Sequence, residues 1–232
     1  MHPVATVLRS FCDRTKIPWA FLAGALAATA IQFADFAHSA WPSALIYDRS
    51  ALSDGQWWRL WTGHLVHYGW LHYAADTAMF LVLGRAIEWK FPAASRLALF
   101  AMPPIITAAI YFFDPGMVRY AGLSALNLAF LIFYAGQSWQ RNWLNWFWPA
   151  VLLVYVGELM LEAQRGGTGG GLVAFSDPAV SIATSAHVAG GTCGLALWMI
   201  CRRKTIPPAT RSADSPASPN GPAASMPAVP PR

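Results

Sequence analysis

The fold of this chain is decided by an uncharged stretch at residues 120–138, YAGLSALNLAFLIFYAGQS. About 20 mostly apolar residues in a helix span the apolar layer of a bilayer, because in lipid each backbone amide must find its hydrogen-bond partner within its own helix. The sequence therefore predicts an all-α polytopic membrane protein with six transmembrane helices. The other five segments of similar length and character lie at residues 17–37, 70–89, 93–113, 143–161 and 178–201.

Composition agrees with a membrane protein. Of the 232 residues, 56% are hydrophobic and only 12% are charged, whereas roughly a quarter of an ordinary soluble domain is charged. The formal net charge of +5 could suggest a nucleic-acid partner, but the basic residues are scattered between apolar segments and form no stripe. We therefore expect the lipid bilayer as the surroundings and no nucleic-acid partner.

The distribution of basic residues predicts the orientation. If the N-terminus is cytoplasmic, twelve of the sixteen Lys and Arg residues lie in inner segments. Translocation of positive charge is disfavoured, so we expect both termini in the cytoplasm. The four that remain in outer segments are Arg49, Arg59, Arg119 and Arg165.

Two further regions differ from the apolar segments. The connection at residues 38–69 contains Trp41, Trp57, Trp58 and Trp61, and tryptophan prefers the headgroup level, so this loop is predicted to lie in the outer interface. Residues 205–232 are dominated by Pro, Ala and Ser, which cannot bury enough apolar surface to fold. We therefore expect a membrane domain at residues 1–204 and a disordered tail at 205–232.

Ionisable groups inside the predicted spans are candidates for function, because each costs roughly 2.5 to 3.5 kcal/mol to insert. Spans two, four and six all begin at the outer face in this topology. His72, Ser124 and His187 should therefore share the outer half of the membrane, at most about 14 Å deep at 1.5 Å per residue. The ionisable residues concerned are His72 and Asp76 in span two, Glu158 and Glu162 in span five, and His187 in span six.

These residue types suit nucleophilic catalysis. A serine hydroxyl needs a neighbouring base, and histidine is the usual base near neutral pH, so Ser124 and His187 are the candidate pair. His72 and Asp76 are four residues apart on one helix face and could face an oxyanion, provided that Asp76 is protonated or only orients His72.

Small residues follow His187 along the sixth span. Gly190 and Gly194 are one turn apart and would allow close approach of another helix, for which span four is the natural partner because Ser124 must reach His187.

Other interpretations of the same residues stay open. A serine at the start of a span is also typical of a helix cap, and a buried His187 is also typical of an interhelical hydrogen bond. Glu158 and Glu162 suit either a water-filled cavity or the outer interface. The cysteine and carboxylate pattern of a closed zinc site is absent from the sequence, and we expect no metal and no cofactor. Interface residues or metal or haem ligands are the alternatives for His64, His67 and His72.

Taken together, the motifs from about Trp57 to Trp198 resemble the rhomboid family of intramembrane serine proteases. The Trp58-Arg59 pair and the segment from Thr62 to His67 resemble the first-loop signature of that family. The stretch from Trp70 to Asp76 resembles the start of its second span. Gly122-Leu123-Ser124-Ala125 resembles the Gly-x-Ser-Gly nucleophile motif, and Ala186 to Gly190 with Gly194 resembles the sixth span, which carries the base.

The resemblance implies a rhomboid-like bundle in a bacterial inner (cytoplasmic) membrane. It implies hydrolysis of a peptide bond of single-pass membrane protein substrates near the outer face by a Ser-His dyad. Ser124 would be the nucleophile and His187 the base, with His72, Asp76 and Gly122 around the oxyanion.

Two positions depart from the family pattern. Ala125 replaces a glycine, and Asp76 replaces an asparagine whose amide could donate to an oxyanion.

The number of spans, Leu161 to Gln164 and Ser185 to His187 are closest to the rhombosortase branch of the family, which implies processing of C-terminal sorting tails. The main alternative is a catalytically inactive rhomboid-like protein that binds membrane clients. A small transporter that uses Glu158, Glu162 and Asp76 is a further alternative, although the internal symmetry typical of that class is not evident. The substrate, the cleavage site and the oligomeric state stay open.

Overall fold

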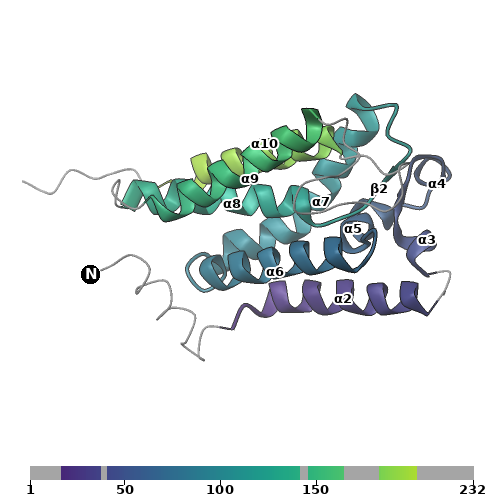
Figure 1. Ribbon diagram of the computed structural model, residues 1–232, viewed down its shortest axis with the longest axis horizontal. Coiled ribbons are helices and arrows are strands. Elements are labelled where there is room, and N and C mark those ends of the chain that lie inside the picture. The colour runs from purple at the N-terminus through teal and green to yellow at the C-terminus, as the bar shows by residue number, and fades with distance from the viewer. Residues whose placement is uncertain (1–16, 38–40, 142–145, 165–182, 203–232) are drawn as a thin grey trace, which may run out of the picture. The chain divides into compact units, whose positions relative to one another are not determined.

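Six long helices run through the part of the chain that the structure describes, and each lies within or close to one of the six predicted segments (Figure 1). The structure is a computed structural model and describes residues 17–37, 41–141, 146–164 and 183–202. The helices are α2 (Trp19–Phe36), α6 (Trp70–Ile87), α7 (Pro92–Phe113), α8 (Ser124–Arg141), α9 (Phe147–Gln164) and α10 (Thr184–Cys201).

Two of these helices, α2 and α7, are long and apolar enough by themselves to cross a membrane. The other long helices carry more polar residues, such as His72, Asp76 and Arg85 on α6, which are all buried against neighbouring helices. Six transmembrane spans and two cytoplasmic termini therefore stay a prediction.

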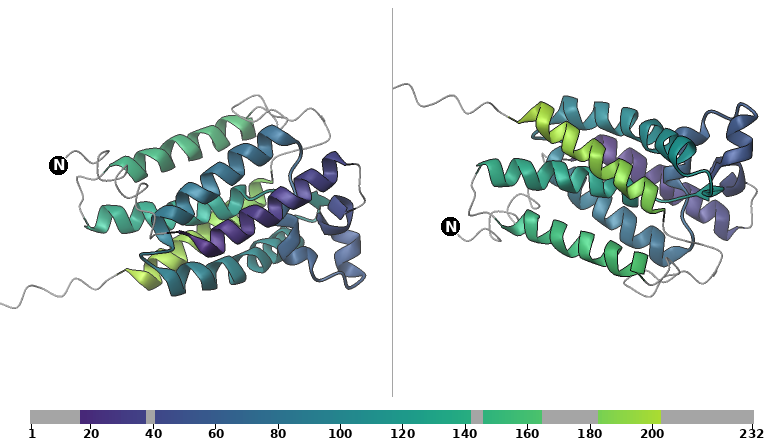
Figure 2. Two further views of the ribbon diagram at one scale, coloured as in Figure 1. Left: turned by 90° about the horizontal axis from the view of Figure 1, so that it is seen from below. Right: turned by 90° about the horizontal axis from the view of Figure 1, so that it is seen from above.

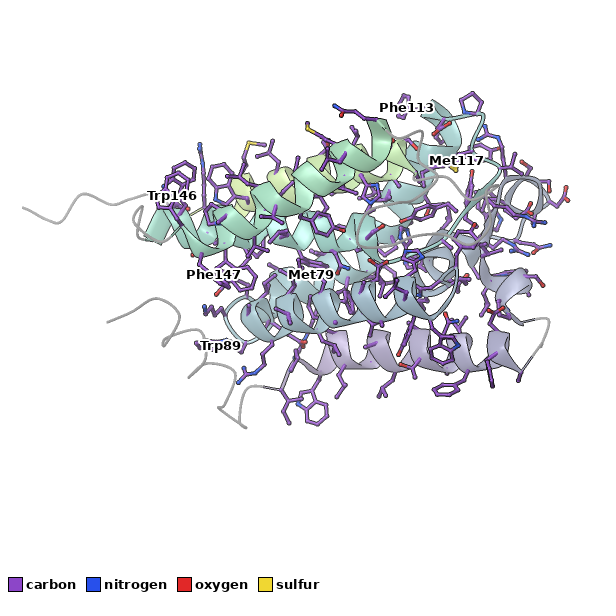
Figure 3. The ribbon with its side chains drawn as sticks, in the orientation of Figure 1. Met79, Trp89, Phe113, Met117, Trp146 and Phe147 are labelled. Carbon is purple, nitrogen blue, oxygen red and sulfur yellow. The ribbon has the colours of Figure 1, made fainter. Side chains whose placement is uncertain are left out.

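Exposed aromatic side chains gather at both ends of the long helices (Figure 3). Trp89, Trp146 and Phe147 lie at one end, and Phe113 at the other. Exposed aromatic side chains near the ends of helices are typical of helices that cross a membrane, where these side chains lie at the headgroup level.

Helix α8 forms the centre of the bundle. It packs against α6, α9 and α10, while α10 also packs against α7 and α2 packs against α6 (Figure 2). Ala125, Ala129, Phe130, Leu131 and Phe133 of α8 are completely buried. Because α8 begins with Ser124, the candidate nucleophile is carried by the most enclosed helix of the bundle.

The α8 helix begins four residues later than the predicted fourth span. Residues Arg119–Tyr120 form a short strand, β2, and Gly122 follows with a φ of +121°. Residues with a side chain rarely adopt this backbone conformation, and it is not helical. The helix therefore starts only after the glycine, at Ser124.

The connection between α2 and α6 folds into short elements beside the start of α8. They are α3 (Trp41–Leu45), β1 (Tyr47–Asp48), α4 (Arg49–Ser53), α5 (Arg59–Thr62) and the single 3-10 turn η1 (Gly63–Leu65). Strand β1 pairs antiparallel with β2, with Tyr47 opposite Tyr120.

The buried guanidinium of Arg59 holds this connection together, because it donates to the carbonyl oxygens of Ser43 and Ile46. Arg59 therefore has a structural role within the loop as well as a position near the predicted interface.

Helix α7 contains Pro103 and Pro104, and neither can donate a backbone hydrogen bond. The missing donor of Pro104 frees the carbonyl oxygen of Phe100 one turn earlier, and that oxygen accepts a hydrogen bond from Trp61 Nε1 at 2.9 Å. The kink-prone part of α7 is thereby attached to the loop that precedes α6.

At the opposite end, Glu88 follows α6 and lies against the start of α2. Its carboxylate accepts the backbone N–H of Ala20 at 3.0 Å and that of Phe21 at 3.5 Å, and it pairs with Arg96 Nε at 3.0 Å. The first amides of a helix have no partner within the helix, so Glu88 caps α2 from the end of α6.

The predicted domain boundary, between residues 204 and 205, lies outside the described residues, which end at residue 202. All described residues belong to one compact unit, residues 1–202. The predicted tail, residues 205–232, lies outside the described residues, as do the side chains of Glu158 and Glu162.

Candidate active site

Ser124 and His187 meet near the ends of two adjacent helices. Ser124 is the first residue of α8, and His187 lies in the first turn of α10. The distance between Ser124 Oγ and His187 Nε2 is 3.0 Å. The histidine is buried and the serine is half-buried, so the pair is largely shielded but the hydroxyl stays within reach of a bound group.

The other ring nitrogen of His187 determines which atom can act as the base. Nδ1 lies 3.0 Å from the carbonyl oxygen of Ala183, one turn earlier. A carbonyl oxygen only accepts hydrogen bonds, so this contact assigns the proton of a neutral His187 to Nδ1. Nε2 then carries the lone pair that faces the hydroxyl of Ser124, as nucleophile activation requires.

Two glycines bring α10 close enough to α8 for this contact. A Cβ atom on Gly190 would lie 2.2 Å from the carbonyl oxygen of Ala125, and one on Gly194 would lie 2.2 Å from that of Ala129. No side chain fits at these distances. The sequence suggested span four as the partner of this glycine face, and the structure places α8 there.

Gly122 lies between the nucleophile and the polar residues of α6. A Cβ atom on Gly122 would lie 2.9 Å from His72 Nε2 and 3.2 Å from Asp76 Oδ2. Both the positive φ and the lack of space therefore require glycine here. The structure thus brings the five predicted site residues Ser124, His187, His72, Asp76 and Gly122 into one cluster.

His72 is oriented by the backbone. Its Nδ1 accepts the N–H of Tyr68 at 3.3 Å, which assigns the proton of a neutral ring to Nε2. That Nε2 lies 3.2 Å from Asp76 Oδ2. A second histidine, His67, places its own Nε2 3.4 Å from the same oxygen. One carboxylate oxygen therefore faces two imidazole rings.

Two more side chains link the site across helices. The amide of Asn127 donates to the backbone oxygen of Asp76 at 3.0 Å, and the hydroxyl of Tyr155 donates to the backbone oxygen of Ser124 at 3.1 Å. Sequence analysis did not single out either residue. Asn127 lies in an otherwise apolar segment, where an amide is costly without a partner, and this signal could have identified it.

The alternatives for the loop histidines can now be compared with their surroundings. His64 and His67 are buried in the protein and do not lie at a lipid-facing surface. Among the residues described, no group of three His, Cys, Asp or Glu side chains is arranged to hold a metal ion.

A helical bundle that places a hydrogen-bonded serine and histidine at the ends of two adjacent helices has the arrangement that nucleophilic catalysis requires. The sequence model of the Rhomboid domain matches residues 54–204, which covers α5 to α10 and every residue of the site. The chain therefore belongs to the rhomboid family, whose members are serine intramembrane proteases. Comparison with curated proteins finds no match.

Proposed function

We propose that this chain is an intramembrane serine protease that hydrolyses a peptide bond of single-pass membrane proteins, with Ser124 as nucleophile and His187 as base. The observation that carries the proposal is the 3.0 Å contact between Ser124 Oγ and His187 Nε2. The contact of Nδ1 with Ala183 supports it, because it leaves Nε2 free to take a proton.

The reaction follows from these atoms. Ser124 Oγ attacks the scissile carbonyl carbon while His187 Nε2 takes the hydroxyl proton. The imidazolium keeps its Nδ1 hydrogen bond to the Ala183 carbonyl, which stabilises the positive charge where other serine proteases use a carboxylate. His187 then gives the proton to the leaving amine, and a water molecule attacks the acyl-enzyme by the same route in reverse.

The oxyanion of the tetrahedral intermediate would lie between α8 and α6. The N–H groups at the start of α8 have no acceptor within the helix, and the positive end of the helix dipole favours negative charge there. His72 Nε2–H approaches this region from α6, against Gly122. Preorganised donors of this kind are worth roughly 10²- to 10³-fold each in rate.

The membrane placement is part of the same proposal. The six long helices would cross a bacterial inner membrane with both termini in the cytoplasm, and α6, α8 and α10 would begin at the outer face. Substrate cleavage would then occur near that face. The sequence resemblance to the rhombosortase branch supports C-terminal sorting tails as the substrate class.

A serine-directed fluorophosphonate tests the proposal on the purified protein in detergent. We expect labelling of the wild type and none of Ser124→Ala or His187→Ala, with unchanged melting temperatures. Failure to label a folded wild type, repeated in lipid vesicles, would contradict the proposal.

One observation favours a second candidate function, a non-catalytic rhomboid-like protein that binds membrane clients. The His72 Nε2–H that should face an oxyanion lies 3.2 Å from Asp76 Oδ2, and a carboxylate there opposes negative charge. This candidate predicts no labelling of the folded wild type together with retention of single-pass clients by both wild type and Ser124→Ala.

A further inference from the structure

A chain of buried polar contacts leads from α7 to the turn before the nucleophile. The carbonyl oxygen of Gly122 accepts the hydroxyl of Tyr120 at 3.0 Å. That hydroxyl lies 3.3 Å from His64 Nδ1, and His64 Nε2 lies 3.1 Å from both Pro103 O and Thr107 Oγ1. Neither His64 nor Tyr120 belongs to the Ser124–His187 dyad or to the residues around the oxyanion.

The protons in this chain can be assigned. Thr107 donates its hydroxyl proton to the carbonyl oxygen of Leu60 at 3.1 Å, so its oxygen accepts from His64. Pro103 O also only accepts. His64 therefore carries its proton on Nε2, and its Nδ1 is a bare acceptor beside Tyr120. Burial lowers the pKa of His64 to about 4 and raises the pKa of Tyr120, so both are neutral near pH 7.

Tyr120 therefore has one hydroxyl proton and two acceptors, Gly122 O and His64 Nδ1. The contact with Gly122 is shorter by 0.3 Å (3.0 against 3.3 Å). His64 is fixed through Thr107 and Pro103 to α7, and its ring packs edge-on against the Tyr120 ring at 5.2 Å. Tyr120 thus holds the carbonyl oxygen of Gly122 at a fixed position relative to α7.

The carbonyl direction at Gly122 matters because the next peptide leads directly to Ser124. A peptide bond is planar and trans, so its C=O and N–H point in opposite directions. Fixing the Gly122 oxygen fixes the Leu123 N–H and the entry into α8. Gly122 has a φ of +121°, and glycine adopts many other conformations freely. The turn therefore needs an external contact to stay in one of them.

We propose that Tyr120 and His64 are positioning residues for the nucleophile, which hold the Gly122–Leu123 peptide so that Ser124 Oγ meets His187 and the following N–H groups face the oxyanion. This inference rests on the proposed protease function and deepens it. It predicts that loss of the Tyr120 hydroxyl lowers the rate at which Ser124 reacts but does not weaken the binding of the reagent.

The experiment measures the labelling rate of wild type, Tyr120→Phe and Tyr134→Phe at increasing fluorophosphonate concentrations. This separates the maximal labelling rate from the fluorophosphonate concentration that gives half of it. Tyr134 is the matched control, because it is a buried tyrosine whose hydroxyl accepts a hydrogen bond from Lys90 Nζ. It lies on α8 about 15 Å along the helix from Ser124. We expect a maximal rate about 3- to 10-fold lower for Tyr120→Phe, an unchanged half-saturation and no change for Tyr134→Phe.

Two substitutions of His64 distinguish positioning from simple anchoring. Asparagine places its amide near the former Nδ1, so His64→Asn keeps a partner for Tyr120. Glutamine reaches the former Nε2, so His64→Gln keeps the partner of Thr107 and Pro103. Positioning predicts faster labelling of His64→Asn than of His64→Gln, when both are folded.

The outcomes separate the two proposals. An unlabelled wild type would overturn the protease function itself. A labelled wild type with equal rates for Tyr120→Phe would overturn the positioning role and leave the protease function intact. The same holds if His64→Gln labels faster than His64→Asn.

Discussion

A Cβ atom on Gly190 would lie 2.2 Å from the carbonyl oxygen of Ala125, the residue next to Ser124. Gly190 follows His187 by less than one helical turn, so this backbone contact lies beside the dyad on both helices. The approach of α10 to α8 at this point therefore sets the distance between the base and the nucleophile. Ala125 itself is fully buried, and its methyl group is part of the packed core.

Gly190→Ala should strongly slow the labelling of Ser124 by a fluorophosphonate. A Cβ atom at position 190 would clash with the carbonyl oxygen of Ala125 at 2.2 Å. Because the backbone within either helix cannot bend aside locally, α10 as a whole must move away from α8. The hydrogen bond between Ser124 and His187 is then lost. We expect a fall of at least about 10²-fold, of the size seen when a catalytic acid or base is removed, with some loss of stability.

Gly191→Ala is the matched control, because it is the adjacent residue on the same helix. Its Cβ atom would lie 3.4 Å from Ile132 Cδ1 and 3.8 Å from Leu128 Cδ2, which are ordinary contacts with side chains. Replacing a helical glycine by alanine stabilises by up to about 1 kcal/mol, so this variant should label normally. Equal labelling of both variants would show that the glycine contact does not control the dyad.

Asp76→Asn should label at least as fast as the wild type, whereas Asp76→Ala should label about 10- to 100-fold more slowly. Asparagine keeps an oxygen that can face His72 Nε2 and His67 Nε2, and it adds N–H donors in place of a negative charge near the oxyanion. Alanine removes the oxygen that faces Nε2 of both imidazoles. Labelling rates at pH 7.5 check the order of the three proteins.

The position of the site could be predicted because its residues lie within short motifs at helical spacing. His72 and Asp76 are one turn apart, and Gly190 is less than one turn from His187, so each helix face follows from the sequence. The pairing of Ser124 with His187 follows from their shared depth in the predicted membrane and from the resemblance to the rhomboid family, and the glycines after His187 favour close packing of the two helices.

The contacts that the sequence did not reveal join residues far apart in the chain. Whether Asp76 faces His67 depends on how the loop before α6 folds, and that loop is held by Arg59, Trp61 and the pairing of Tyr47 with Tyr120. The start of α8 was placed four residues too early. Apolar periodicity alone does not show that Gly122 has a positive φ.

Glu88→Gln should lower the free energy of unfolding by about 1–2 kcal/mol, because a charged acceptor at the start of α2 is replaced by a neutral one. The carboxylate is buried and accepts the N–H groups of Ala20 and Phe21. Thermal unfolding in detergent, followed by tryptophan fluorescence, measures the change.

Arg96→Gln is the comparison for Glu88. The Arg96 side chain is 59% exposed, so its ion pair with Glu88 should contribute less than about 1 kcal/mol. Equal losses in the two variants would mean that the ion pair, and not the capping of α2, stabilises this end of the bundle.

The folded protein should lose stability as the pH falls from about 6.5 to about 4, in part through His64. Burial lowers the pKa of His64 from its ordinary value of 6.5 to about 4. Between these two values the unfolded chain binds a proton at this position and the folded protein does not. The free energy of unfolding therefore decreases as the pH decreases. Above pH 6.5 the contribution of the neutral ring is complete, and below pH 4 no further loss arises from this residue. Melting temperatures at pH 7.5, 5.5 and 4.5 should therefore fall more steeply for the wild type than for His64→Asn, which has no titrating group here. Parallel curves would show that His64 takes up its proton equally in both states and is not held neutral beside Tyr120.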